Sequence, residues 1–287
     1  MKKIEKQTTK LFTGIHNSQL QNKSIFNRLV NLYSESFFKV KKNFFKKKIC
    51  LDAGSGLNLN ATLALIKLGA EYVYAIDLNK KIKKIKKPPF NKFHDKYEVR
   101  HGNLKKLPYP SNFFDFVLCA GAIHHTTDWK KSLNELSRVT KKTGYIYIEA
   151  YGKGGLVRDL TTALRIKFKT SSNFRKLILN LSTFQVRDFC RYFFERKNIK
   201  NINNLIDDDL ILTIKDRIMS PIYQEFSQDE IVVILKKNKF KNIKKLRRFP
   251  KFKNVRKYLS KFYYDHDHKY SKILYGSGMP HILAKKS

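Results

Sequence analysis

The sequence predicts an α/β fold, in which strands and helices alternate along the chain and the helices flank one sheet. Two apolar runs, at residues 49–53 and 72–76, are short and rich in branched or aromatic side chains, as buried strands are. Between them, apolar residues recur at helical spacing, which predicts a helix through Leu63, Ile66 and Leu68. A strand, a helix and a second strand in this order form the repeating unit of such folds.

Glycines and an acid mark the ends of these two predicted strands. Gly54 and Gly56 follow the first strand, and because they lack a Cβ atom they allow a tight turn and the close approach of a ligand. Asp77 ends the second strand, where a carboxylate can accept hydrogen bonds from both hydroxyls of a ribose. The arrangement predicts a nucleoside-binding site, with a purely structural turn as the alternative interpretation.

The loop distinguishes between two classes of nucleoside cofactor. A dinucleotide site requires a third glycine three residues after Gly56, and Leu59 occupies that position. The remaining pattern, Asp52-x-Gly54-x-Gly56, resembles motif I of the class I S-adenosylmethionine-dependent methyltransferases. Asn58 replaces the third glycine that is common in that family, and asparagine tolerates unusual backbone angles.

Further segments follow in the order of that family. They are similar to the third strand, the fourth strand, the loop after it, and the helix and fifth strand of the ubiquinone/menaquinone-type methyltransferase branch: residues 101–109, 113–120, 122–125, 133–139 and 142–149. The resemblance covers residues 45–152. It implies a Rossmann-like seven-stranded methyltransferase sheet flanked by helices, with a helical insertion after strand five.

The resemblance also implies S-adenosylmethionine as the cofactor. The residues expected to bind it are Asp52, Ala53, Gly54, Ser55, Gly56, Asn58, Asp77, Leu78, Asn103, Leu104, Ala120 and His125. Asn103 stands where an acid commonly meets the adenine amino group in the family. Its side-chain oxygen can accept that hydrogen bond, although it carries no charge.

Candidates for a catalytic role lie at the predicted strand ends, because ligands bind at the carboxyl ends of strands in such sheets. His124 and His125 follow strand four, and either can serve as a base toward an alcohol, a phenol or a protonated amine. Loop packing is the alternative role for both histidines. Tyr151, after strand five, is a candidate to bind or orient the substrate. No metal site is predicted, since the alternating Asp and His residues at 265–268 are typical of a solvated loop.

Breaks in pattern divide the chain into four parts. Residues 1–46 are predicted to be a polar tail and a cover helix, 47–152 the cofactor-binding core, 153–215 a helical insertion that covers the substrate, and 216–287 the C-terminal part of the core. Helical spacing predicts the cover helix through Phe26, Leu29, Val30, Tyr33 and Phe37, and the insertion through Leu156, Leu160, Leu164, Leu177, Leu179, Leu181, Phe189, Tyr192 and Phe193. The insertion either recognises the substrate or only packs as a lid.

Capping chemistry marks the return to the core. Ser227 precedes Glu230 by three residues, a capping box that predicts a helix over residues 229–238. The sixth strand is predicted at residues 246–249 and the seventh at 275–284. Residues 251–270 receive no assignment.

The formal net charge of +37 is the most unusual feature of the composition. Such an excess ordinarily indicates a nucleic acid or an anionic membrane as the partner. However, only 13 of the 60 basic residues are Arg, and the 47 Lys are spread along the chain. A phosphate-binding stripe would be clustered and richer in Arg, so a solvated lysine-rich surface is the favoured interpretation.

Other features of the sequence favour a cytoplasmic protein. No apolar run reaches the length of a membrane span, and the first residues lack the apolar segment of a secretion signal. The three cysteines are odd in number, and Cys50 and Cys119 fall inside predicted strands, which indicates core packing rather than disulfides.

Three hypotheses for the function follow. The first is methyl transfer from S-adenosylmethionine to an oxygen or nitrogen of a small-molecule metabolite. The second is methylation of transfer or ribosomal RNA. The net charge favours this hypothesis, but the sequence has no recognisable appended RNA-binding module. The third is a non-catalytic protein that keeps the fold for binding. The acceptor atom and the oligomeric state stay open.

Overall fold

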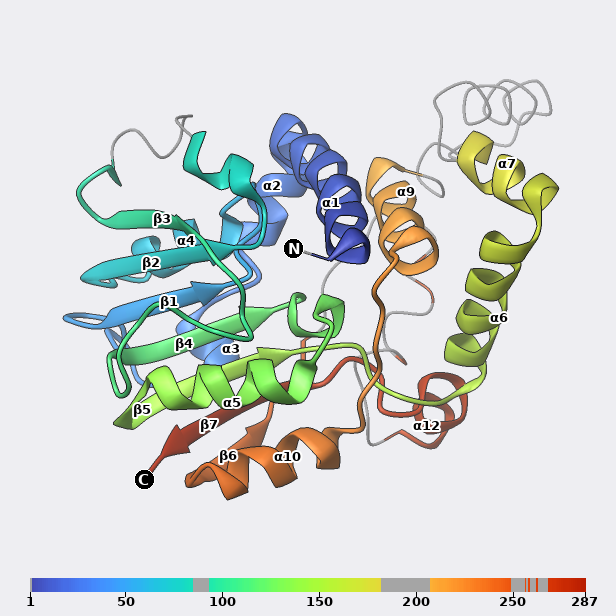
Figure 1. Cartoon of the computed structure of the whole chain (residues 1–287). Coiled ribbons are helices and arrows are strands. Elements are labelled where there is room, and N and C mark those ends of the chain that lie inside the picture. Colours follow the sequence, from blue (N-terminus) through green and yellow to red (C-terminus); the bar gives the residue numbers. More distant parts are fainter. Residues whose placement is uncertain are drawn as a thin grey trace. The chain divides into compact units, whose positions relative to one another are not determined.

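The computed structural model describes residues 2–84, 93–181, 207–248, 256, 258, 262 and 268–287, which form two compact units (Figure 1). Unit 1 consists of residues 1–152, 222–248 and 279–287. Unit 2 consists of residues 153–221 and 249–278, so it includes a second segment that the sequence prediction placed in the core.

The described residues of unit 1 build a seven-stranded sheet in the order β3-β2-β1-β4-β5-β7-β6. Its strands are β1 Ile49–Ala53, β2 Tyr72–Asp77, β3 Tyr97–His101, β4 Phe114–Ala120, β5 Thr140–Glu149, β6 Phe240–Lys245 and β7 His281–Lys286. Strands β1 to β5 pair in parallel, and β7 runs antiparallel to both of its neighbours. This arrangement confirms the predicted Rossmann-like methyltransferase sheet.

Helices cover both faces of the sheet (Figure 1). One face packs against α2 Lys23–Val30, α3 Glu35–Phe38 and α4 Asn60–Lys67. The other face packs against α5 Trp129–Val139 and α10 Gln228–Lys237. The predicted capping box is present at the start of α10, where the Ser227 hydroxyl accepts from the Glu230 N–H and the Glu230 carboxylate accepts from the Ser227 N–H.

The predicted positions of the last two strands were wrong. Strand β6 is Phe240–Lys245 rather than 246–249, and β7 begins at His281, after α12 Lys269–Tyr275 has ended. Only Phe240 of β6 is fully buried, and its lysines face solvent at the edge of the sheet. Lysine-rich edge strands lack the alternation of apolar residues that identifies a strand, and this composition protects the edge from pairing with other chains.

The N-terminal prediction also requires correction. Within residues 1–46, the segment predicted to be a polar tail forms the 19-residue helix α1 Lys3–Gln21, and the single predicted cover helix is divided into α2 and α3. Asn22 separates α1 from α2, because its side-chain oxygen accepts from the Ile25 N–H at 3.1 Å and so starts a new helix. Ser34 caps α3 in the same way.

Unit 2 is helical where the structure describes it. Helix α6 Leu156–Thr170 is followed by α7 Ser172–Leu181, α9 Asp208–Ile214 and the π-helical turn η5 Lys215–Met219. Arg165 of α6 is buried and donates to the carbonyl oxygens of Arg217 and Ser220, at 2.7 Å each. Phe189, Tyr192 and Phe193 lie outside the described residues, and the substrate-covering role of this segment stays a prediction.

Two cysteines pack in the sheet as predicted. Cys50 on β1 and Cys119 on β4 are fully buried and free, and burial raises the pKa of both thiols above the usual value. Cys190 lies outside the described residues. Among the helices that the structure describes, none combines the length and apolarity that crossing a membrane requires.

Candidate functional site

The predicted glycine turn connects β1 to α4 and lies against the ends of β2 and β4. Gly54 and Gly56 have φ angles of 79° and 63°, a region that favours glycine. The N–H groups of Gly54 and Ser55 donate to the carbonyl of Ile76, at 2.8 and 3.1 Å. A Cβ atom on Gly54 would lie 2.2 Å from the Cβ of Ala122, so the turn needs glycine for packing as well as for its backbone angles.

Asp77 lies at the carboxyl end of β2, directly beside the turn. One carboxylate oxygen accepts from the Gly56 N–H at 3.0 Å, and the other accepts from the Asn79 N–H at 2.8 Å. Each carboxylate oxygen can accept more than one hydrogen bond, so Asp77 retains acceptor capacity for two ribose hydroxyls. The half-buried side chain therefore fits both roles, fixing the turn and holding a ribose.

The unusual backbone angle expected at Asn58 is found at the next residue instead. Leu59 has a φ of 49° and precedes the first residue of α4, whereas Asn58 does not have a positive φ. The buried Asn58 side chain donates to Gln19 of α1 at 2.6 Å. Its observed role is to connect the turn to α1.

Asp52, the acid of the motif, supports the turn from within the core. It is 2% exposed, and its carboxylate accepts from the Thr62 hydroxyl of α4 at 2.7 Å. Burial raises the pKa of Asp52 to about 7, with a smaller contribution from the nearby Asp77 and partial compensation by the hydrogen bonds from Thr62. Ala53 and Ser55 beside it are also buried.

The other predicted cofactor residues lie at the same edge of the sheet. Asn103 and Leu104 follow β3, Leu78 follows Asp77, and Ala120 ends β4. The Asn103 side-chain oxygen accepts from the Lys105 N–H at 3.0 Å, and Leu104 is buried and reaches toward Gly54.

The catalytic candidates form an aromatic cluster after β4 and β5. His124 is fully buried and stacks on Tyr151, with ring centroids 3.8 Å apart, and Tyr151 in turn contacts Tyr223. His125 is only half-buried, and its Nδ1 lies 2.8 Å from the carbonyl oxygen of Ile222. A carbonyl can only accept, so neutral His125 carries its proton on Nδ1 and its lone pair on Nε2. His124 is a packing residue of this cluster, whereas the ring of His125 is half-buried and its Nε2 is shielded from solvent.

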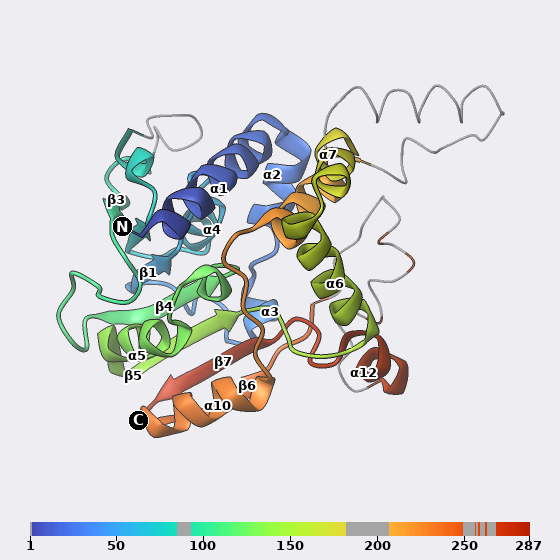
Figure 2. The same cartoon turned by 45° about the vertical axis from the view of Figure 1, so that its right-hand side comes forward.

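Helix α1 contributes site residues that the sequence prediction missed (Figure 2). The His16 Nδ1 accepts from the Leu57 N–H at 3.2 Å, and the ring of Phe12 lies 4.6 Å from that of His125. The hydroxyl of Thr13 accepts from the Asn79 side chain at 2.8 Å. Helix α1 therefore covers the edge at which β1, β2 and β4 end.

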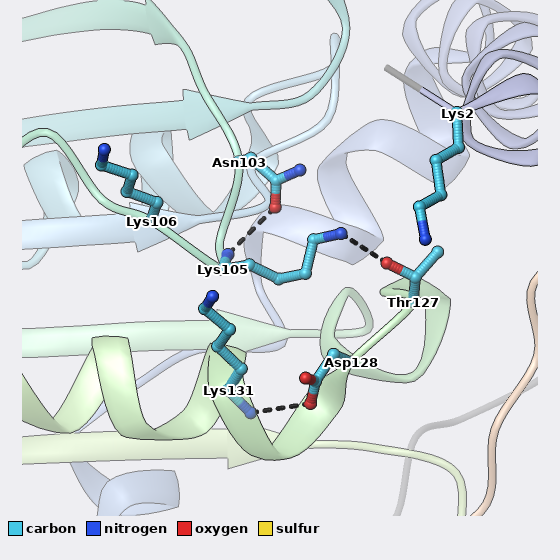
Figure 3. A pocket seen from close by; sticks show the side chains of 7 residues that line it. All are labelled: Lys2, Asn103, Lys105, Lys106, Thr127, Asp128 and Lys131. Carbon is cyan, nitrogen blue, oxygen red and sulfur yellow. Dashed lines mark hydrogen bonds between the residues drawn. The ribbon is translucent and has the colours of Figure 1, made fainter.

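A pocket of about 450 Å³ opens next to Asn103 (Figure 3). Its lining residues are Lys2, Asn103, Lys105, Lys106, Thr127, Asp128 and Lys131. Asn103 is one of these residues, so the pocket adjoins the predicted adenine position, and Thr127 follows His125 by two residues in the chain.

The described residues contain no group of three or more His, Cys, Asp or Glu side chains arranged to hold a metal ion. Residues 265–267 of the alternating Asp and His segment lie outside the described part. His268 lies in it and caps α12, its Nδ1 accepting from the Tyr270 N–H at 3.2 Å.

Comparison with known proteins identifies the same segment of the chain. Residues 51–148 match the model of the methyltransferase domain family. An uncharacterized protein of Methanocaldococcus jannaschii is 28% identical over 137 residues, covering 46% of this chain and 56% of that protein. Demethylmenaquinone methyltransferase of Geobacillus stearothermophilus is 32% identical over 108 residues, covering 36% of this chain and 45% of that enzyme. The chain thus spans about half the length of these curated relatives.

A solved structure agrees with the sheet topology. The YcgJ protein of Bacillus subtilis superposes with a TM-score of 0.50 at 14% identity, over 91% of this chain and 98% of that one. At this identity the likeness concerns the fold alone.

Proposed function

The chain carries a class I S-adenosylmethionine-dependent methyltransferase domain, and from this premise we propose that it transfers a methyl group to an oxygen or nitrogen of a small-molecule metabolite. The observation that supports this most is the convergence at one sheet edge of the glycine turn, Asp77 and His125. A cytoplasmic location is part of the proposal.

The residues at the sheet edge fit the cofactor. Gly54 and Gly56 give the turn its left-handed backbone angles, with Ala122 and His16 packed against them, and Asp77 retains acceptor capacity for the ribose. The Asn103 amide lies beyond β3, where it would meet the adenine. When bound, S-adenosylmethionine supplies an activated methyl group on a sulfonium, so the protein mainly has to align the acceptor and exclude water.

His125 is the residue that we assign as the base. The Ile222 carbonyl fixes its Nδ1 as the protonated nitrogen, so Nε2 is the basic atom of the neutral ring. Nε2 is shielded from solvent, so the hydroxyl or ammonium group of the acceptor would have to enter beside it to give up its proton. Phe12 packs against the same ring from α1 and limits its motion. Tyr151, whose ring centroid lies 5.9 Å from that of His125, would orient the acceptor.

The cover provided by α1 favours a compact acceptor. His16, Thr13 and Gln19 connect this helix to the loops after β1 and β2, so the site is enclosed on that side. A large rigid duplex would have to displace these contacts.

Methyl transfer from radiolabelled S-adenosylmethionine tests the proposal. The labelled cofactor is supplied with a small-metabolite extract and, in parallel, with total RNA, near physiological salt. Label is expected in the metabolite fraction. Label in one discrete RNA species, lost on RNase treatment and absent from the metabolites, would overturn the small-molecule assignment.

RNA methylation is the second candidate function, and the net charge of +37 is the observation that favours it. The lysines of the described residues are distributed over both units rather than gathered into one arginine-rich stripe. We therefore rank it below the small-molecule reaction.

A further inference from the structure

The pocket beside Asn103 is strongly basic. Four of its seven lining residues are lysines, against one carboxylate, that of Asp128. The lysines come from three separate segments, since Lys2 precedes α1, Lys105 and Lys106 follow β3, and Lys131 lies in the first turn of α5. Packing these three segments together therefore concentrates positive charge at one place.

One ammonium group in the pocket is held in place. The Nζ of Lys105 donates to a carboxylate oxygen of Glu5 at 3.0 Å and to the Thr127 hydroxyl. Burial opposes ionisation of Glu5, but hydrogen bonds from the Lys2 N–H and Lys105 outweigh it and lower the pKa of that carboxyl. Glu5 is therefore charged at neutral pH and forms an ion pair with Lys105.

The other two ammonium groups that reach the pocket have no directly bonded carboxylate among the described residues; the charge of Glu135, which is bonded to Arg138, acts on Lys131 only from a distance. Within the part of the chain that the structure describes, the Nζ atoms of Lys2 and Lys131 form no hydrogen bond or ion pair (Figure 3). Lys106 points away from the other three lysines. Asp128 is occupied in part by the Lys131 N–H, to which its carboxylate is bonded at 2.9 Å as a helix cap.

This combination suits a phosphate group. A phosphate monoester carries close to two negative charges at neutral pH and three acceptor oxygens, and lysine binds it as a point charge. Lys2 and Lys131 supply the charges, and Lys105, which Glu5 and Thr127 hold in place, lies beside them. A carboxylate, with one charge, would leave more of this positive potential uncompensated.

We propose that this pocket binds a phosphate monoester carried by the acceptor, so that the substrate class is a phosphorylated small molecule. The inference rests on the proposed function, because the acceptor would extend from His125 past Thr127 into the pocket. A pocket of this size suits one phosphate group with part of a small molecule, whereas an RNA backbone offers one charge per nucleotide along an extended path.

Calorimetric titration of the full chain tests the proposal without requiring turnover. The probes are inorganic phosphate, glucose 6-phosphate, glucose, and a short RNA oligonucleotide without a terminal phosphate, all at constant ionic strength. Saturable binding with one site per chain is expected for both phosphate probes and none for glucose. The double variant Lys2→Gln/Lys131→Gln should weaken that binding by roughly tenfold or more, since each substitution removes one positive charge of the protein that faces the phosphate.

Lys130→Gln is the matched control, because Lys130 neighbours Lys131, is exposed, and does not line the pocket. It should bind phosphate like the unaltered chain. An equal loss of phosphate affinity in Lys130→Gln and in the double variant would mean that phosphate responds only to the general surface charge of the protein. That result, or tighter binding of the oligonucleotide than of glucose 6-phosphate, would overturn the proposal.

Binding of S-adenosylmethionine is measured in the same preparations to separate the two claims. Absence of phosphate binding with intact cofactor binding overturns the phosphate inference alone. Phosphate binding that depends on Lys2 and Lys131, in a chain without methyl transfer, supports the pocket and contradicts the proposed function.

Discussion

At the scale of single residues, the site places the acids of two adjacent strands, Asp52 of β1 and Asp77 of β2, in different roles. Asp52 is buried and bonded to Thr62 within the core, whereas Asp77 is half-buried and faces the turn. The histidine pair also divides, since His124 is fully buried against Tyr151 while His125 is half-buried and bonded through Nδ1 to the Ile222 carbonyl.

Asp52 should make stability depend on pH. Its pKa is raised from 3.8 to about 7 in the folded state, so its contribution to stability is full below pH 3.8 and is lost as pH rises through about 7. Asp52→Asn removes this titration, and the melting temperature should then fall less between about pH 5 and pH 8 than in the unaltered chain. If both proteins lost the same amount of melting temperature between about pH 5 and pH 8, the result would contradict the burial of a titrating Asp52.

His125→Gln should reduce methyl transfer by roughly 10²- to 10⁴-fold, because the side chain can no longer take up the proton of the acceptor. Cofactor affinity, measured by calorimetry, should change far less. The exposed His94 provides the matched control His94→Gln, which should retain full activity. Full methyl-transfer activity in His125→Gln would contradict the assignment of His125 as the base.

At the scale of elements, α1 is the least predictable helix in the molecule and the one that completes the site. The side chains through which it contacts the loops are Glu5, Thr13, His16 and Gln19, which are polar, with Phe12 among them. Polar contacts interrupt its apolar residues, among them Phe12 and the buried Ile15, so hydrophobic periodicity gives only a weak signal for this helix. The sequence feature that indicates helix α1 is the absence of Gly and Pro over residues 3–13.

The ion pair between Glu5 and Lys105 should hold α1 in place. The contribution of this ion pair to the stability of the fold is full above pH 4.5, the usual pKa of a Glu carboxyl. It is lost as the pH falls through the lowered pKa that Glu5 has in the folded state. Glu5→Gln should therefore raise amide exchange in α1 at neutral pH, at a cost of roughly 1–3 kcal/mol for a buried charge-assisted bond. Glu71→Gln at an exposed position is the control, and equal exchange in both variants would contradict this role.

The central strands and the glycine turn were predictable, because Gly54, Gly56 and Asp77 belong to short apolar runs with a clear motif. Strand β6 was not, since lysines face solvent along the sheet edge and leave only Phe240 as a buried marker. The left-handed angle at Leu59 was also not predictable from residue type, because tertiary packing imposes it on a residue that rarely adopts it.

At the scale of the whole molecule, the charge excess is the property that separates the two candidate functions. A spread of lysines attracts RNA through counterion release, so affinity should fall steeply between about 50 and 200 mM salt. Cofactor affinity should change little over the same range, since its contacts at Gly54, Asp77 and Asn103 lie at the sheet edge beneath α1. Filter binding with transfer RNA and calorimetry with the cofactor measure the two responses. RNA binding that persists at physiological salt would favour the RNA reaction.

Calorimetric titration with S-adenosylmethionine, its demethylated product and NAD tests the central claim most directly. We expect binding of the first two and none of NAD, because the turn lacks the third dinucleotide glycine. Asp77→Ala should weaken cofactor binding by at most roughly 1.5–3 kcal/mol for each ribose hydrogen bond lost. Binding of NAD, or unchanged cofactor affinity in a folded Asp77→Ala variant, would contradict the assignment of this sheet edge as the cofactor site.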